Sequence, residues 1–178
     1  MSCILIGNGT SVLDGCAVRK IDSFDFVVRF NNCQIKGYEN HVGSRTTDWW
    51  TVLKFQRSIF DQLSPLTSIW FHSWVKDESQ CEAFKTYLNT PARKVDLAMT
   101  EEMCAYSGQT QYSSWSTGAI AIWFSLKTFP FVSLCGFDWW MRRDHHYCDN
   151  ANRGTLHKPE IEKIFIDRMR EEGKVEFL

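Results

Sequence analysis

The stretch from Cys3 to Asn32 constrains the fold most, because it holds two short apolar runs that each end in glycine or asparagine. Ile4-Leu5-Ile6 has the composition of a buried strand and is followed by Gly7-Asn8-Gly9. Phe26-Val27-Val28 leads into Arg29-Phe30-Asn31-Asn32. In an open α/β sheet, ligands bind beyond the carboxyl ends of the strands. We therefore expect both turns to form the floor of a nucleotide site, with a pair of ordinary polar turns as the alternative.

Strand-like and helix-like segments alternate along the remaining chain. Further strands are expected at Asp48–Val52, Ser68–Trp74, Lys94–Met99, Phe131–Cys135 and Lys174–Leu178. Helices are expected at Asp77–Leu88, Thr100–Cys104, Gly118–Leu126 and Pro159–Glu172. This alternation predicts the α/β class, with a mostly parallel central sheet of about seven strands flanked by helices. We see no internal boundary, so residues 1–178 are expected to form a single domain.

Charge and composition narrow the classes of function. The net charge is −1 and there is no basic tract, so nucleic acid is not an expected partner. No apolar run approaches the roughly 20 residues of a membrane span, and a strand that begins at Cys3 leaves no room for a signal peptide. The seven cysteines include no CxxC pair, which favours reduced thiols over a disulfide framework or a zinc ribbon. A cytoplasmic location is therefore expected. The oligomeric state is not indicated.

The Gly7-Asn8-Gly9 turn matches neither common phosphate motif. No Gly-Lys-Ser/Thr follows it, and Val12 stands where a third glycine would complete GxGxxG. The chain also lacks the Asp-x-Asp pair with which many glycosyltransferases hold a metal ion, so no metal or cofactor is expected. Ser116-Thr117-Gly118 precedes an apolar run, and such a helix start can hold a carboxylate or phosphate. The alternative is a capped core helix.

Three histidines, His145, His146 and His157, lie close together in the sequence. Their spacing matches no zinc signature, and histidine titrates near neutrality, so acid–base chemistry is the favoured interpretation. Solvated loop histidines are the alternative. Glu162 is a candidate for the same site, or a solvated helix residue that pairs with Lys158 one turn back.

Four segments together resemble the animal-type sialyltransferases that carry the sialyl motifs L, S, III and VS. The large motif is matched by Cys3–Thr47, notably Ile6-Gly7-Asn8-Gly9, Ile21–Asn31 and Val42–Thr47. The small motif is matched from Ser116-Thr117-Gly118 to Gly136-Phe137. Motif III is matched by His145-His146-Tyr147, and the very small motif by His157 and Glu162. All four segments occur in the order of the family and cover roughly half of the chain.

The resemblance implies a GT-A-like, Rossmann-related fold and an inverting, metal-independent transfer from CMP-sialic acid to a glycan hydroxyl. It implies that His157 takes the proton of the acceptor and that His146 donates a hydrogen bond to the departing phosphate. A transferase for another CMP-activated acidic sugar of the Kdo type, or a binding module without turnover, remains an alternative. The substrate-binding residues implied by position are Gly7, Asn8, Gly9, Thr10, Asn31, Ser116, Thr117, Gly118, Gly136, Tyr147 and Glu162.

Two departures from the family pattern bear on the expected structure. The family has a cysteine bridge between the large and small motifs; Cys3 is present, but Phe129 stands at the position of its partner. Trp115 replaces the proline that is usual before Ser-Thr-Gly. The chain is also shorter than typical family domains, mainly between these two motifs, so donor binding is better supported than any particular acceptor.

Overall fold

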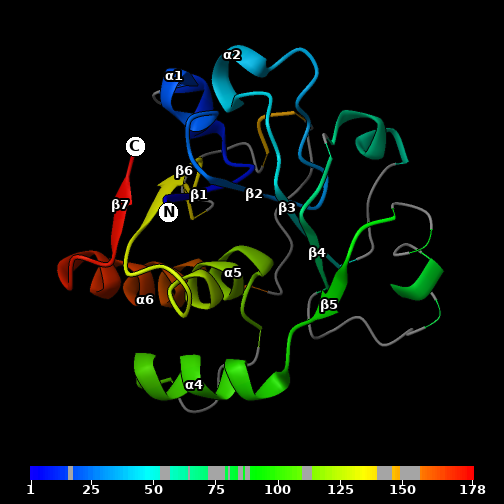
Figure 1. The fold of residues 1–178 in the computed structure, drawn as a ribbon. Coiled ribbons are helices and arrows are strands. Elements are labelled where there is room, and N and C mark those ends of the chain that lie inside the picture. The colour runs from blue at the N-terminus through cyan, green and yellow to red at the C-terminus, as the bar shows by residue number, and fades with distance from the viewer. Residues whose placement is uncertain are drawn as a thin grey trace.

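The computed structural model is built on one sheet of seven strands, and every pair of neighbouring strands is parallel (Figure 1). It describes residues 1–15, 18–52, 57–63, 65–71, 79, 81–83, 86, 89–109, 114–139, 146–148 and 157–178. The strands are β1 (Cys3–Ile6), β2 (Phe26–Phe30), β3 (Asp48–Thr51), β4 (Ser68–Phe71), β5 (Ala92–Lys94), β6 (Val132–Cys135) and β7 (Val175–Phe177). Their order is β5-β4-β3-β2-β1-β6-β7, which confirms the predicted α/β class.

Helices cover both faces of this sheet (Figure 1). One face carries α1 (Val18–Ile21) and α2 (Glu39–Val42), and the other carries α5 (Thr117–Ser125) and α6 (Pro159–Glu171), with α4 (Leu97–Ser107) packed beneath α5. Two 3₁₀ helices are also described, η1 (Thr10–Asp14) and η2 (Arg57–Gln62). Within the described residues, no helix is long and apolar enough to cross a membrane.

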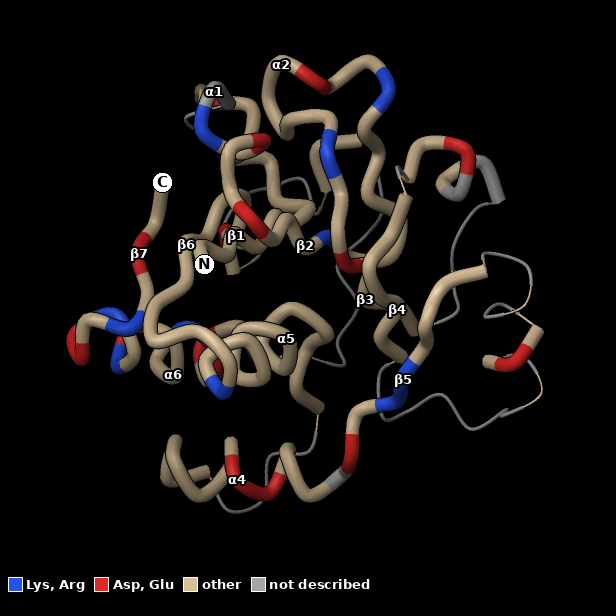
Figure 2. Tube along the Cα trace, in the orientation of Figure 1, with Lys and Arg blue, Asp and Glu red and all other residues tan. Residues whose placement is uncertain are grey.

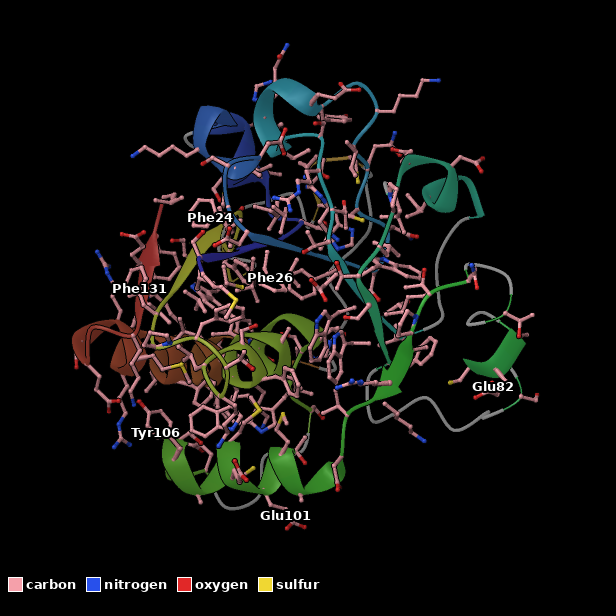
Figure 3. All side chains as sticks on the ribbon, viewed as in Figure 1. Phe24, Phe26, Glu82, Glu101, Tyr106 and Phe131 are labelled. Carbon is pink, nitrogen blue, oxygen red and sulfur yellow. The ribbon has the colours of Figure 1, made fainter. Side chains whose placement is uncertain are left out.

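The largest core cluster lies between the sheet and the α5–α6 layer, where side chains fill the space (Figure 3). The run Ala119–Ile122 on α5 is fully buried in it, as its almost wholly apolar sequence predicts. The amphipathic α6 contributes Phe165, Ile166 and Met169. Charged residues of both signs are interspersed on the surrounding helices and turns (Figure 2).

One predicted boundary is wrong. Lys94–Met99 was expected as a strand, but β5 ends at Lys94 and α4 begins at Leu97. The Asp96 side chain accepts a hydrogen bond from Ala98 N at 3.0 Å, and such an N-cap outweighs the strand propensity of the apolar residues around it. The expected short helix at Thr100–Cys104 is accordingly part of a longer one. Of the helix expected at residues 77–88, the described residues 79, 81–83 and 86 are helical, and the others lie outside the described residues.

A buried arginine fixes the polar turn of the large motif to the sheet. Arg29 on β2 is fully buried, and its Nη2 donates hydrogen bonds to the carbonyls of Val42 (2.6 Å), Gly43 (3.2 Å) and Arg45 (3.0 Å). Its Nε donates to Thr46 Oγ1 at 3.0 Å. One guanidinium therefore satisfies several buried acceptors at once, because its donors spread in a plane.

We expect Arg29→Lys to lower the free energy of unfolding by about 2 kcal/mol, because an ammonium group at this site leaves buried carbonyls without donors. Urea denaturation measures this loss. Arg170→Lys, which changes an exposed residue of α6, is the matched control and should change stability little. Equal effects of the two substitutions would contradict the assigned role of Arg29.

Candidate active site

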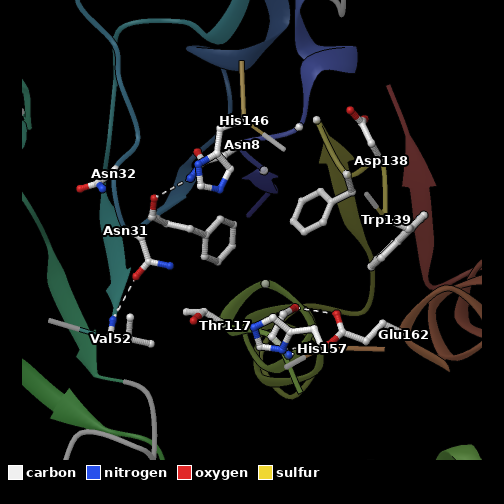
Figure 4. A pocket seen from close by; sticks show the side chains of 17 residues that line it. Asn8, Asn31, Asn32, Val52, Thr117, Asp138, Trp139, His146, His157 and Glu162 are labelled. Carbon is white, nitrogen blue, oxygen red and sulfur yellow. Dashed lines mark hydrogen bonds and ion pairs between the residues drawn. The ribbon is translucent and has the colours of Figure 1, made fainter. Parts of the chain in front are cut away.

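A cavity of about 280 Å³ opens at the carboxyl edge of the sheet, where β1, β2 and β6 end and α5 begins (Figure 4). The strand order reverses at β1, with β2 on one side and β6 on the other, and such a switch point is where open α/β sheets bind ligands. Most of the predicted site residues line this cavity: Gly7, Asn8, Gly9, Asn31, Ser116, Thr117, Gly118, Gly136, His146, His157 and Glu162.

Glycines allow the two strand ends to approach each other. Gly7 N donates to Cys135 O at 2.7 Å, and Gly9 N donates to Gly136 O at 2.9 Å, so the pairing of β1 and β6 continues past the strands. A Cβ atom on Gly7 would lie 2.3 Å from Gly136 O, which no other residue tolerates. The floor of the cavity is therefore bare backbone, which lets a ligand lie close to the main chain.

Two asparagines form the wall beside this floor. Asn8 Nδ2 donates to Phe30 O at 3.2 Å, and its buried Oδ1 has no hydrogen-bond partner. Asn31 has a positive φ of 43°, and its Oδ1 accepts from Val52 N at 3.0 Å. Because Oδ1 of Asn31 is turned to Val52, its amide NH₂ group faces the cavity (Figure 4). An amide donor and an unpaired amide acceptor suit a ligand with both hydroxyl and phosphate oxygens.

The start of α5 is tied to the start of α6 by one carboxylate. Ser116 Oγ caps α5 by accepting from Ala119 N at 3.1 Å. Glu162 on α6 accepts from Ser116 N and from Ser116 Oγ, both at 2.6 Å (Figure 4). Glu162 is fully buried, so the interpretation of a solvated helix residue is wrong. It orients the first turn of α5 towards the cavity.

His157 lies at the same junction. Its Nδ1 is 2.7 Å from Ser114 O and 4.0 Å from Glu162 Oε1. A carbonyl oxygen only accepts hydrogen bonds, so Nδ1 carries the proton in the neutral ring and Nε2 carries the lone pair. The imidazole stands beside Thr117 at the entrance of α5 (Figure 4). This tautomer presents a nitrogen that is able to accept a proton.

His146 lines the opposite side of the cavity, close to Asn8 (Figure 4). The next residue, Tyr147, holds this segment: its N–H donates to Asn8 O at 2.9 Å and its hydroxyl donates to Gln34 O.

Two predicted site residues, Tyr147 and Thr10, do not line the cavity. Tyr147 is buried in the core, and the hydroxyl of Thr10 donates to Asp138 Oδ2 at 3.3 Å. For both residues, direct substrate contact stays a prediction. His145 lies outside the described residues.

Asp138 lines the cavity and was not predicted as a site residue. Its Oδ2 accepts from Ser11 N at 2.9 Å, which fixes the start of η1 to the end of β6. The signal that could have identified it is its place two residues after Gly136, at the same carboxyl edge as Asn8.

Within the described residues, no group of three or more His, Cys, Asp or Glu side chains is arranged to hold a metal ion.

The two departures from the family pattern lie in the core. Cys3 is a buried free thiol whose pKa burial raises to about 12, and Phe129 is buried in the same core cluster, where it packs on Phe26 with ring centroids 5.1 Å apart. Trp115 is fully buried against Phe165, at 4.7 Å between ring centroids. Each substitution is therefore accommodated by aromatic packing.

A parallel sheet with a cavity at the reversal of strand order defines an open-sheet α/β protein with its cavity at the topological switch point. The model of glycosyltransferase family 29 (sialyltransferase) matches residues 1–104. The chain therefore belongs to glycosyltransferase family 29, the sialyltransferases.

Named relatives and solved structures agree with this membership. The human CMP-N-acetylneuraminate-beta-galactosamide-alpha-2,3-sialyltransferase 1 is 26% identical over 89% of this chain and 51% of its own length. The bovine lactosylceramide alpha-2,3-sialyltransferase is 25% identical over 97% of this chain and 51% of its own. The chain thus spans about half the length of these curated relatives. A crystal structure of a mammalian sialyltransferase in complex with Gal-beta-1-3GalNAc-ortho-nitrophenol shares the fold, with a TM-score of 0.77 and 20% identity over 99% of this chain and 68% of that one.

Proposed function

We propose that this chain transfers sialic acid from CMP-sialic acid to a hydroxyl of a glycan, with inversion and without a metal ion. The observation that carries the proposal is that segments far apart in the sequence, which hold Asn8, Ser116, His146 and His157, line one cavity. These are the positions to which the resemblance assigns the donor contacts and the two catalytic imidazoles. Family membership and the shared fold support the proposal.

The proposed reaction is a single displacement. Nε2 of His157 accepts the proton of the acceptor hydroxyl as its oxygen bonds to the anomeric carbon of the sialic acid. The bond from that carbon to the phosphate oxygen breaks, and CMP departs with the electron pair. His146 donates a hydrogen bond to the departing phosphate, and the first turn of α5 faces the sugar carboxylate. Attack and departure occur on opposite faces of the carbon, which inverts its configuration.

Incubation of the protein with CMP-sialic acid and a panel of galactosides tests this activity. We expect a sialylated product, or slow hydrolysis of the donor when no acceptor fits, and the same rate with and without a chelator of divalent cations. Product from CMP-Kdo but not from CMP-sialic acid would assign the other acidic sugar. Binding of CMP by calorimetry with no product under any condition would assign a binding module and overturn the proposed transfer.

A further inference from the structure

Two cysteines lie near each other beside the cavity and do not belong to its lining. Cys33 follows β2 and is buried, whereas Cys148 is half-buried, and neither forms a disulfide bond. Cys148 Sγ lies 3.7 Å from Asn32 O, the carbonyl of the peptide bond that leads into Cys33. Its sulfur is therefore no more than about 6.5 Å from the Cα atom of Cys33.

Hydrogen bonds of Tyr147 hold the segment of Cys148 close to the segment of Cys33. Tyr147, directly before Cys148, donates its hydroxyl to Gln34 O, directly after Cys33. The Tyr147 N–H also donates to Asn8 O at 2.9 Å. Residues 147–148 are thus fixed alongside residues 32–34, which holds the Cys148 sulfur near the side chain of Cys33.

A buried cation, the guanidinium of Arg29, lies near Cys33. Burial raises the pKa of the Cys33 thiol to about 12, and the charge of the Arg29 guanidinium opposes only part of that rise. Cys148 is close enough to Cys33 for the two thiols to influence each other electrostatically. The thiolate is the form that exchanges with a disulfide, so a thiol with this raised pKa is expected to react slowly at neutral pH and faster as the pH rises.

We propose that Cys33 and Cys148 are a modification site, at which a low-molecular-weight disulfide oxidises the two thiols to an intramolecular bridge. The Cys148 thiolate attacks the oxidant and releases one thiolate. The Cys33 thiolate then attacks the Cys148 sulfur of this mixed disulfide and releases the second. One S–S bond forms in the protein and one is lost from the oxidant, which takes up the two electrons and becomes two thiols.

The bridge would join two walls of the cavity. Asn31 lies two residues before Cys33, and His146 lies two residues before Cys148. Oxidation therefore fixes the segment of His146 to the carboxyl end of β2. The bridging chemistry is independent of the proposed transfer, so either can fail alone.

Oxidation by oxidised glutathione, followed by intact mass and peptide mapping, tests the pair. We expect the loss of two hydrogen atoms, a Cys33–Cys148 peptide, faster formation at higher pH, and a melting temperature higher by roughly 5–10 °C. Cys148→Ser should show neither bridge nor shift, whereas Cys104→Ser, at another half-buried cysteine, should keep both. Cys33→Ala should accumulate Cys148 as a glutathione adduct. A stable adduct on Cys148 of the unmodified chain, or a bridge between any other pair, would overturn the proposal.

Discussion

Replacement of His157 by alanine is expected to lower kcat for sialyl transfer by roughly 10²–10⁴-fold, with little change in the affinity for CMP. The range is that of general base catalysis by a positioned side chain. The bond between His157 Nδ1 and Ser114 O already selects the tautomer in which Nε2 accepts a proton. Loss of the ring removes the base and leaves the asparagine wall and the start of α5 in place. Steady-state kinetics measures the first effect and calorimetry with CMP the second.

The matched control for this substitution is His41→Ala, which removes an imidazole from α2, outside the cavity lining. Its kcat should stay within about threefold of the unmodified chain. If His157→Ala retained full kcat with a normal melting temperature, another residue would have to be the base. If both variants lost activity together, the loss would reflect the fold instead of the chemistry.

Glu162→Ala is expected to cost about 3 kcal/mol of folding free energy, because it removes both acceptors of Ser116 in a fully buried setting. The Ser116 N–H and O–H donors then lose their acceptor, and α6 loses this polar connection to α5. Glu162→Gln should lose less, since an amide oxygen still accepts from the N–H and the amide NH₂ can donate to the hydroxyl. Urea denaturation of the unmodified chain and the two Glu162 variants measures their free energies of unfolding.

Glu160→Ala provides the comparison for this second prediction. Glu160 belongs to the same first turn of α6 but is exposed. A surface substitution of this kind should change stability by no more than about 0.5 kcal/mol. A loss at Glu162 as small as that at Glu160 would show that the contact between α5 and α6 contributes little to the fold.

Strands were easier to predict from the sequence than helix boundaries. Ile4-Leu5-Ile6 and Phe26-Val27-Val28 are apolar on both faces, and a parallel sheet covered on both sides requires that pattern. The exception, Lys94–Met99, is apolar enough for a strand, but the local hydrogen bond of the Asp96 side chain starts α4 there. Such a cap depends on the conformation of one side chain, and the spacing of apolar residues along the sequence carries no information about it.

The candidate site could be predicted where each residue follows directly from a strand end or a helix start, as for Asn8, Asn31 and Ser116. The sequence did not reveal what those residues bond to. Glu162 has the pattern of a solvated helix residue but is fully buried, and there it accepts hydrogen bonds from Ser116, which is 46 positions earlier in the sequence. Asp138 accepts a hydrogen bond from Ser11 N at the start of η1, and the two residues are 127 positions apart in the sequence. No local sequence pattern predicts a contact over such a separation.

The sheet terminates on both sides in three-residue strands, β5 and β7, while the cavity sits over β1 near the middle. Insertions beyond either margin can therefore lengthen a chain of this fold without displacing the strands that support the cavity.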